Sequence, residues 1–183
     1  GGLALISFTV VGGIANSASC PKSGGILKYG VKAEPPTYDM HGTNSYAVMH
    51  FVAQHYSTLL TFDWNKFPKL EGDVADSWNV SSDGLTYTLK IKKGIKFHDG
   101  SPLTSKDVKA TYDRLRNPPE GVISVRKALF SSISGITTPD DNTVVFKLSS
   151  PDAFMLDGFA SPFNAIYSAK DIAKDPKWHL KNI

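Results

Sequence analysis

The chain has 183 residues, of which 41% are hydrophobic and 20% are charged, and its formal net charge is +3. This is ordinary globular composition, sufficient for one good core. The basic residues are scattered, and even the lysines of residues 90–96 lack the interleaved aromatic residues of a nucleic-acid surface, so we predict a solvated face and no nucleic-acid partner.

Residues 1–24 have the pattern of a partial signal peptide followed by a linker. The apolar run of residues 3–14 is shorter than the roughly 20 residues of a membrane-spanning helix, and small polar residues follow it up to Cys20, the single cysteine. Because no methionine or basic segment precedes the run, we expect the sequence to start inside the signal peptide. Cys20 has the position of a lipoprotein acceptor, but Ser17 stands where an apolar residue is usual. Lipid anchoring at Cys20 and an ordinary soluble export signal therefore both stay open.

The first elements of the folded body are predicted as a strand at residues 26–31, ended by Pro35 and Pro36, and an amphipathic helix over residues 43–60. Thr43, Asn44 or Ser45 could cap that helix. His50 and His55 are five residues apart on it, which places them on different faces and predicts surface or packing roles rather than a metal site. A short strand at residues 60–63, a turn and an extended segment at residues 70–78 follow.

Residues 78–108 contain the strongest pattern of the sequence. Residues 85–92 alternate apolar and polar side chains, which predicts a half-buried strand after the Asp83-Gly84 turn. A second short strand is expected at residues 95–97, before a turn at His98-Asp99-Gly100. Thr104 and Asp107 have the spacing of a capping box in front of a helix whose apolar stripe is Val108, Tyr112 and Leu115.

The remaining elements are shorter. The capped helix should end at the double proline 118–119, and residues 122–130 could form a short helix. Residues 133–137 and 143–148 predict a hairpin. Residues 153–159 should pack through their apolar side chains, residues 161–166 should enter another strand, and residues 169–175 should form a short charged helix.

An ordered series of motifs resembles the signature of the bacterial extracellular solute-binding proteins of family 5. The matching residues are Ala75, Trp78, Asp83-Gly84, Thr86 to Lys90, Phe97 to Gly100, Thr104 and Asp107-Val108. Members are the peptide-binding subunits of ABC importers, and related members take up nickel, haem precursors or sugars. The resemblance implies an α/β fold with mixed sheets, like the type II periplasmic binding proteins, with an incomplete first lobe and an inserted subdomain.

The resemblance also implies how the chain is divided. Residues 25–42 would hold the opening strand and cleft loop of the first lobe, residues 43–160 the inserted subdomain, and residues 161–183 the start of the return to the first lobe, with the second lobe absent. By position, five residues would lie at the edge of the ligand cleft: Lys32, Ala33, Glu34, Pro35 and Pro36. The two prolines could offer only carbonyl groups to an extended peptide, and an ordinary loop is the alternative.

Several aromatic residues are less firmly assigned to the core than Tyr87, Phe97, Tyr112 and Phe146. One or two of them could face a ligand. These are Tyr29, Tyr38, Tyr46 and Trp64.

The sequence contains none of the common catalytic or nucleotide-binding motifs. The His98-Asp99 pair and Asp83 lie at turns, where aspartate accepts backbone N–H groups, so we assign no catalytic residue, metal or cofactor. The predicted function is a monomeric, non-enzymatic substrate-binding component of an ABC importer, periplasmic or extracellular, that delivers di- or oligopeptides to a membrane permease. The alternatives are another solute such as nickel, haem or sugar, an exported enzyme with its catalytic residues elsewhere, and a receptor or peptide chaperone.

Overall fold

The computed structural model describes residues 24–26, 28 and 30–183, in two units that divide after Gly30. In the first unit, the described residues 24–26, 28 and 30 contain no strand, so the predicted strand at 26–31 is wrong for Ile26, Lys28 and Gly30. A strand requires a neighbour that accepts its N–H groups, and none of the described strands pairs with this stretch. Cys20 and the signal-like segment lie outside the described residues.

A four-stranded antiparallel sheet forms the centre of the second unit. Its strands are β3 (Ala75–Val80), β4 (Thr86–Ile91), β5 (Ile133–Asp140) and β6 (Thr143–Leu148), in the order β3-β4-β6-β5. The predicted alternation in β4 is confirmed, because Tyr87, Leu89 and Ile91 are buried. The predicted hairpin is confirmed as β5 and β6.

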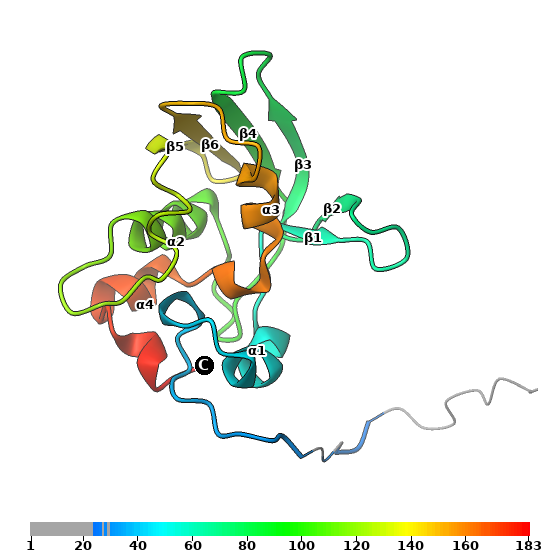
Figure 1. Ribbon diagram of the computed structural model, residues 1–183, viewed down its shortest axis with the longest axis vertical. Helices are drawn as coiled ribbons and strands as arrows, with labels where there is room; N and C mark the ends of the chain where they lie inside the picture. The colour runs from blue at the N-terminus through cyan, green and yellow to red at the C-terminus, as the bar shows by residue number, and fades with distance from the viewer. Residues whose placement is uncertain (1–23, 27, 29) are drawn as a thin grey trace, which may run out of the picture. The chain divides into compact units, whose positions relative to one another are not determined.

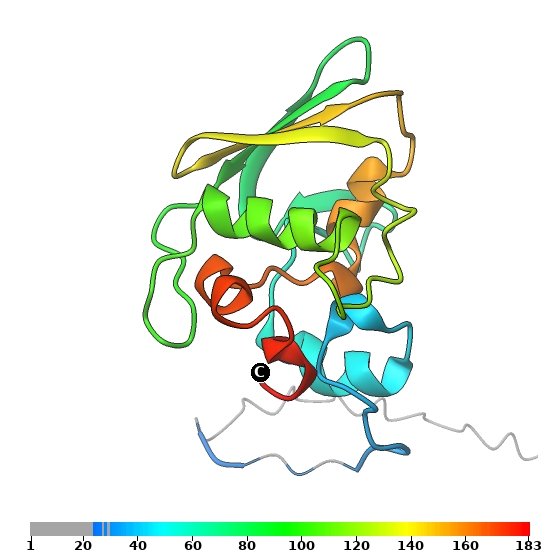
Figure 2. The ribbon, with the colours of Figure 1, turned by 90° about the vertical axis from the view of Figure 1, so that its left-hand side faces the viewer.

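The helix α2 (Ser105–Arg116) lies across one face of this sheet (Figure 2). Its predicted stripe of Val108, Tyr112 and Leu115 is fully buried. The ring of Tyr112 meets Phe130 and Phe146 edge-on, each with 5.1 Å between ring centroids, an arrangement that favours aromatic packing. The predicted capping box is present, and the helix ends at the cap residue Asn117 as expected.

A two-stranded hairpin and a short helix complete this core. The strands β1 (Leu60–Phe62) and β2 (Leu70–Gly72) pair antiparallel, and the hairpin projects beside the sheet (Figure 1). The helix α3 (Met155–Ala160) contributes buried Phe159, whereas Phe154 just before it is exposed. The expected packing of residues 153–159 is therefore confirmed for Phe159 and wrong for Phe154.

A second, smaller core joins the two ends of the unit. It holds the buried residues Met40, Val48, Val52, Ala165 and Tyr167. They come from η1 (Met40–Gly42), α1 (Tyr46–Val52) and the segment before α4 (Ala169–Lys174), with η2 (Ala53–His55), η3 (Pro162–Asn164) and η4 (Trp178–Leu180) alongside. The short charged helix predicted at 169–175 is thus confirmed as α4.

The helix predicted over residues 43–60 is shorter than expected. Ser45 caps it, as one of three candidates, but helical structure ends at His55. The chain then becomes extended because the carbonyl groups of Thr58 and Leu59 accept N–H groups from Val74 and Ala75. Long-range pairing therefore overrides the continued helical spacing.

Three other elements differ from expectation because their backbone groups bond elsewhere. The predicted strand at 95–97 is a single bridge between Lys96 and Pro102, since proline has no N–H to extend a ladder. Residues 122–124 have no regular structure and residues 125–130 form turns, because the N–H of Val125 donates to the carbonyl of His41 rather than within a helix. The predicted strand after 161–166 is absent, because the N–H groups of Ile166 and Tyr167 donate to the Ser57 carbonyl and the Thr111 hydroxyl.

Among the described residues, no helix has both the length and the apolar character needed to cross a membrane.

Candidate ligand-binding segment

The predicted cleft-edge residues lie together on the surface of the second unit. Lys32, Ala33, Glu34 and Pro36 are exposed and Pro35 is half-buried. Residues 32–36 make no hydrogen bond to any residue that the structure describes. Three backbone N–H groups, at Lys32, Ala33 and Glu34, and all five carbonyl groups are therefore available to a ligand. That these residues bind one stays a prediction.

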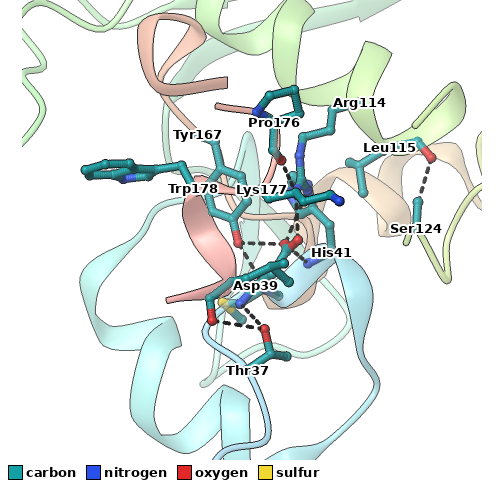
Figure 3. A network of polar contacts seen from close by, with 12 residues as sticks. Thr37, Asp39, His41, Arg114, Leu115, Ser124, Tyr167, Pro176, Lys177 and Trp178 are labelled. Carbon is teal, nitrogen blue, oxygen red and sulfur yellow. Dashed lines mark hydrogen bonds and ion pairs between the residues drawn. The ribbon is translucent and has the colours of Figure 1, made fainter. Parts of the chain in front are cut away.

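The chain becomes tightly held immediately after this segment (Figure 3). The N–H of Tyr38 donates to the carbonyl of Leu180 at 3.3 Å. The carboxylate of Asp39 accepts the N–H of His41 and also meets the guanidinium of Arg114. The backbone therefore changes from making no hydrogen bond to the described chain at Pro36 to being hydrogen-bonded at Tyr38, two residues later.

Asp39 and Arg114 form a buried ion pair, with each side chain only 1% exposed. Two guanidinium nitrogens of Arg114 donate to the two carboxylate oxygens, at 2.6 and 3.2 Å. Burial would raise the pKa of Asp39, but the hydrogen bonds and charge of Arg114, with smaller contributions from His41, hold this pKa below its ordinary value. The carboxylate is therefore ionised, and the pair is a charged, two-point attachment.

His41 is a neutral member of the same cluster. Its Nδ1 lies 2.9 Å from a nitrogen of Arg114, and its Nε2 lies 2.9 Å from the carbonyl of Ala165. Because a guanidinium can only donate and a carbonyl can only accept, Nδ1 must accept and Nε2–H must donate. Burial, followed by the nearby charge of Arg114, lowers the pKa of His41 to about 3.

Tyr167 lies between two histidine rings in this cluster. His41 stacks on the Tyr167 ring with 4.2 Å between centroids, and His179 stacks on it as well. The Tyr167 hydroxyl accepts the N–H of Met40 at 2.9 Å and donates to Asp39 at 3.4 Å. Burial raises the pKa of Tyr167 well above its ordinary value, so the phenol stays protonated and can donate to the carboxylate.

A second buried arginine holds the chain just beyond this point. Arg126 is 8% exposed and donates to the carbonyl groups of Met40, His41 and Thr43 and to the side chain of Asn44. Burial lowers the pKa of Arg126 to about 10, which leaves it charged at neutral pH. Its hydrogen bonds replace the water that these carbonyl groups would otherwise bind.

The other sequence candidates lie apart from this cluster or at turns. Trp64 and Tyr46 are 90% and 68% exposed, Tyr38 is half-buried near Phe51, and Tyr29 lies outside the described residues. His50 and His55 are exposed, as predicted.

Asp99 accepts the N–H and hydroxyl of Ser101 in a turn, and these bonds, with Lys170, lower the pKa of Asp99 to about 2. Asp83 likewise accepts the N–H of Leu85. The predicted turn-forming roles of both aspartates are confirmed.

The buried cluster was missed from the sequence. Its members Asp39, His41, Arg114, Tyr167 and His179 lie on separate elements and share no local spacing. One weak signal was available on α2: Arg116 has Asp113 three residues away as a partner, whereas Arg114 has no carboxylate three or four residues away on the helix. An unpaired arginine beside a buried stripe indicates a partner from elsewhere in the chain.

Comparison with known proteins places the chain in a family. Residues 69–183 match the sequence model of the middle region of bacterial extracellular solute-binding proteins, family 5. The chain belongs to this family. The assignment agrees with the signature motifs at residues 75–108.

Two curated relatives and one solved structure illustrate the similarity. A Brucella ovis protein, provisionally named as an ABC transporter peptide-binding protein, is 39% identical over 134 residues, which cover 70% of this chain and 25% of the relative. The glutathione-binding protein GsiB of Pectobacterium atrosepticum is 41% identical over 101 residues, covering 55% and 19%. This family 5 chain therefore spans about a fifth to a quarter of the length of these two curated relatives.

The structure of the PBP AgaA from A.tumefacien R10, in complex with agropinic acid, superimposes with a TM-score of 0.72 and 33% identity. The match covers 78% of this chain and 28% of AgaA. The predicted fold class, mixed α/β of the periplasmic-binding-protein kind and covering part of that fold, is thereby confirmed.

Proposed function

We propose that this chain is part of the substrate-binding component of an ABC importer, which captures di- or oligopeptides outside the cytoplasmic membrane and delivers them to a permease. The observation that carries the proposal is membership of the solute-binding family. Similarity to a relative named for peptide binding supports the peptide as solute. The exposed, unbonded backbone of residues 32–36 is the matching feature of the structure.

The mechanism would be binding rather than chemistry. An extended peptide would pair its own backbone with the N–H groups of Lys32, Ala33 and Glu34 and with neighbouring carbonyl groups, as in addition of a strand to an edge. Each such bond contributes about 0.5 to 1.5 kcal/mol net, whereas micromolar affinity needs about 8 kcal/mol. Residues 32–36 would therefore supply a minority of the affinity, and closure of a second lobe over the solute would supply the rest.

The domain division is part of this proposal. Residues 25–42 and 161–183 would belong to the first lobe, and residues 43–160 to a subdomain inserted in it. Pairing of Tyr38 with Leu180 supports this, because it joins the two proposed first-lobe segments.

Binding can be tested on the whole gene product by isothermal titration calorimetry with defined di-, tri- and oligopeptides. The variant Ala33→Pro removes one of the three free N–H groups and should bind on the order of tenfold more weakly, the equivalent of one or two lost polar contacts. The matched control Ala33→Ser changes the same exposed position but keeps its N–H, and should bind normally. Equal affinity of the two variants would remove the Ala33 N–H from the site.

The same titrations separate the alternatives. Tight binding of glutathione, nickel, haem or a sugar with no response to peptides would replace the solute but keep the import role. Turnover of a peptide by the purified protein would instead indicate an exported enzyme. Binding without uptake in cells that lack the neighbouring permease genes would support import, whereas binding with no permease encoded nearby would favour a receptor or peptide chaperone.

Export and anchoring belong to the proposal as well. We expect a periplasmic or extracellular monomer, with lipid attached to Cys20 if the cysteine is an acceptor. Metabolic labelling with a fatty acid would decide this, because a Cys20→Ser variant should lose the label and the membrane association. An unlabelled wild-type protein in the soluble periplasmic fraction would show an ordinary export signal.

A further inference from the structure

We infer that Arg114, on α2, is the positioning residue of the ligand-binding segment at residues 32–36. This inference rests on the proposed function. Arg114 makes no hydrogen bond to residues 32–36. It would act through Asp39, which it binds three residues after the segment. The observations that carry it are three contacts of one buried guanidinium.

The first contact fixes the chain that leaves the segment. Two guanidinium nitrogens of Arg114 donate hydrogen bonds to the two carboxylate oxygens of Asp39, which lies three residues after Pro36. A two-point attachment defines an orientation as well as a distance. Lysine would preserve the charge but could supply only a single point of attachment.

The second contact fixes the chain that runs beside it. The Arg114 nitrogen that binds Asp39 at 2.6 Å also donates to the carbonyl of Pro176 at 3.1 Å. Pro176 precedes η4, whose residue Leu180 accepts the N–H of Tyr38. One guanidinium therefore binds both chain segments that this backbone bond joins, at the residue after Tyr38 and four residues before Leu180.

The third contact, with His41, restrains the position of the guanidinium. His41 accepts a hydrogen bond from Arg114 at 2.9 Å, and the helix that carries Arg114 is fixed to the sheet by fully buried Tyr112 and Leu115. Residues 32–36 are in this way connected to the central sheet through Asp39, Arg114 and α2. Since residues 32–36 have no hydrogen bonds of their own to the described chain, their position depends on the attachments that follow them at Thr37, Tyr38 and Asp39.

The test uses variants that keep both charges but change the geometry, Arg114→Lys and Asp39→Glu, in the whole gene product. The control is Leu60→Val, which weakens the core at a fully buried residue of β1, outside α2 and the cluster. Hydrogen exchange of the Tyr38, Met40 and His41 amides, and affinity for the best peptide, are measured for each protein. The free energy of unfolding is measured alongside, so that variants of equal stability are compared.

We expect exchange at Tyr38 and Met40 to rise by on the order of tenfold in Arg114→Lys, the equivalent of one lost charged hydrogen bond, with a similar loss of peptide affinity. Exchange at Leu89 in β4 should stay as in the wild type. Leu60→Val should leave the ratio of Tyr38 to Leu89 exchange and the affinity unchanged. If Arg114→Lys does not fold, Asp39→Glu provides the same comparison.

The inference is overturned if exchange at Tyr38 and Met40 is unaffected, or if it rises while peptide affinity stays at the wild-type value. A wild-type protein that binds no solute would instead remove the proposed function. The exchange data would then still show whether Arg114 fixes this part of the chain.

Discussion

The imidazole of His179 stacks on the phenol ring of Tyr167, with 3.6 Å between ring centroids, and neither imidazole nitrogen has a hydrogen-bond partner among the described residues. Burial, together with the charge of Arg114, lowers the pKa of His179 to about 4. His41, on the other face of Tyr167, is also neutral. The folded protein therefore resists protonation at two histidines that the unfolded chain would protonate near pH 6.5.

Stability should consequently fall as the solution is acidified from about pH 6.5 toward pH 4. In this range the unfolded state binds protons that the folded state does not, so each histidine lowers the free energy of unfolding by up to about 1.4 kcal/mol per pH unit. The contribution is complete above pH 6.5 and is lost as pH falls toward the lowered pKa values. Urea unfolding at half-unit pH steps would measure the slope.

The variant His179→Phe isolates one of the two histidines. Phenylalanine can keep the stacking on Tyr167 but cannot titrate, and it removes two buried nitrogens without partners. The slope between pH 6.5 and 4 should drop by about half, and the variant should gain stability at pH 5 relative to the wild type. An unchanged slope would mean that His179 is protonated equally in both states.

Asp107 should contribute more to stability than its role in the capping box requires. One carboxylate oxygen accepts the N–H of Thr104 at 2.8 Å, and the other accepts the N–H of Ala169 at the start of α4, at 2.9 Å. Thr104→Ala should cost about 1 kcal/mol, as for a helix cap, whereas Asp107→Ala should cost about 2 to 4 kcal/mol. Equal losses in urea unfolding would contradict a link between α2 and α4.

Two buried tyrosines should respond in opposite ways to loss of the hydroxyl. The Tyr112 hydroxyl has no hydrogen-bond partner in the part of the chain that the structure describes, so Tyr112→Phe should be neutral or stabilising by up to about 1 kcal/mol. Tyr167→Phe leaves the N–H of Met40 and a carboxylate oxygen with fewer bonds and should cost about 1 to 3 kcal/mol. Thermal unfolding of the two variants provides the comparison, and a destabilised Tyr112→Phe would reveal a partner for that hydroxyl.

Gly72, at the end of β2, should not tolerate a side chain. A Cβ atom there would lie 2.1 Å from the carbonyl oxygen of Ala75, and a backbone atom cannot rotate away. Gly72→Ala should therefore cost about 2 to 3 kcal/mol. Gly135→Ala in β5, where a Cβ meets nothing within 4 Å, should be neutral or slightly stabilising in the same urea assay, and equal effects would refute the steric explanation.

The elements that were predicted correctly from the sequence are those whose structure is determined by residues close to one another in the chain. The alternation through β4, the spacing of Thr104 and Asp107, and the turn at Asp83 each fix a structure within a few residues of the signal. The hairpin of β5 and β6 belongs to the same class.

The elements that were mispredicted depend on partners distant in the sequence. Residues 165–167 are apolar enough for a strand, but Ile166 bonds to Ser57 and Tyr167 to Thr111. The site follows the same rule. The exposed segment at residues 32–36 was selected through resemblance, while Asp39 and Arg114 are 75 residues apart and no local pattern connects them.

The bond between the N–H of Met40 and the hydroxyl of Tyr167 joins residues separated by 127 positions. Contacts of such long range have to close a large loop before they stabilise anything, so they form late in folding. The hairpins and α2 can form from neighbouring residues, so we expect them to form earlier. We therefore expect residues 39–41 to leave the ribosome well before Tyr167 and to reach their folded positions only after Tyr167 has been made.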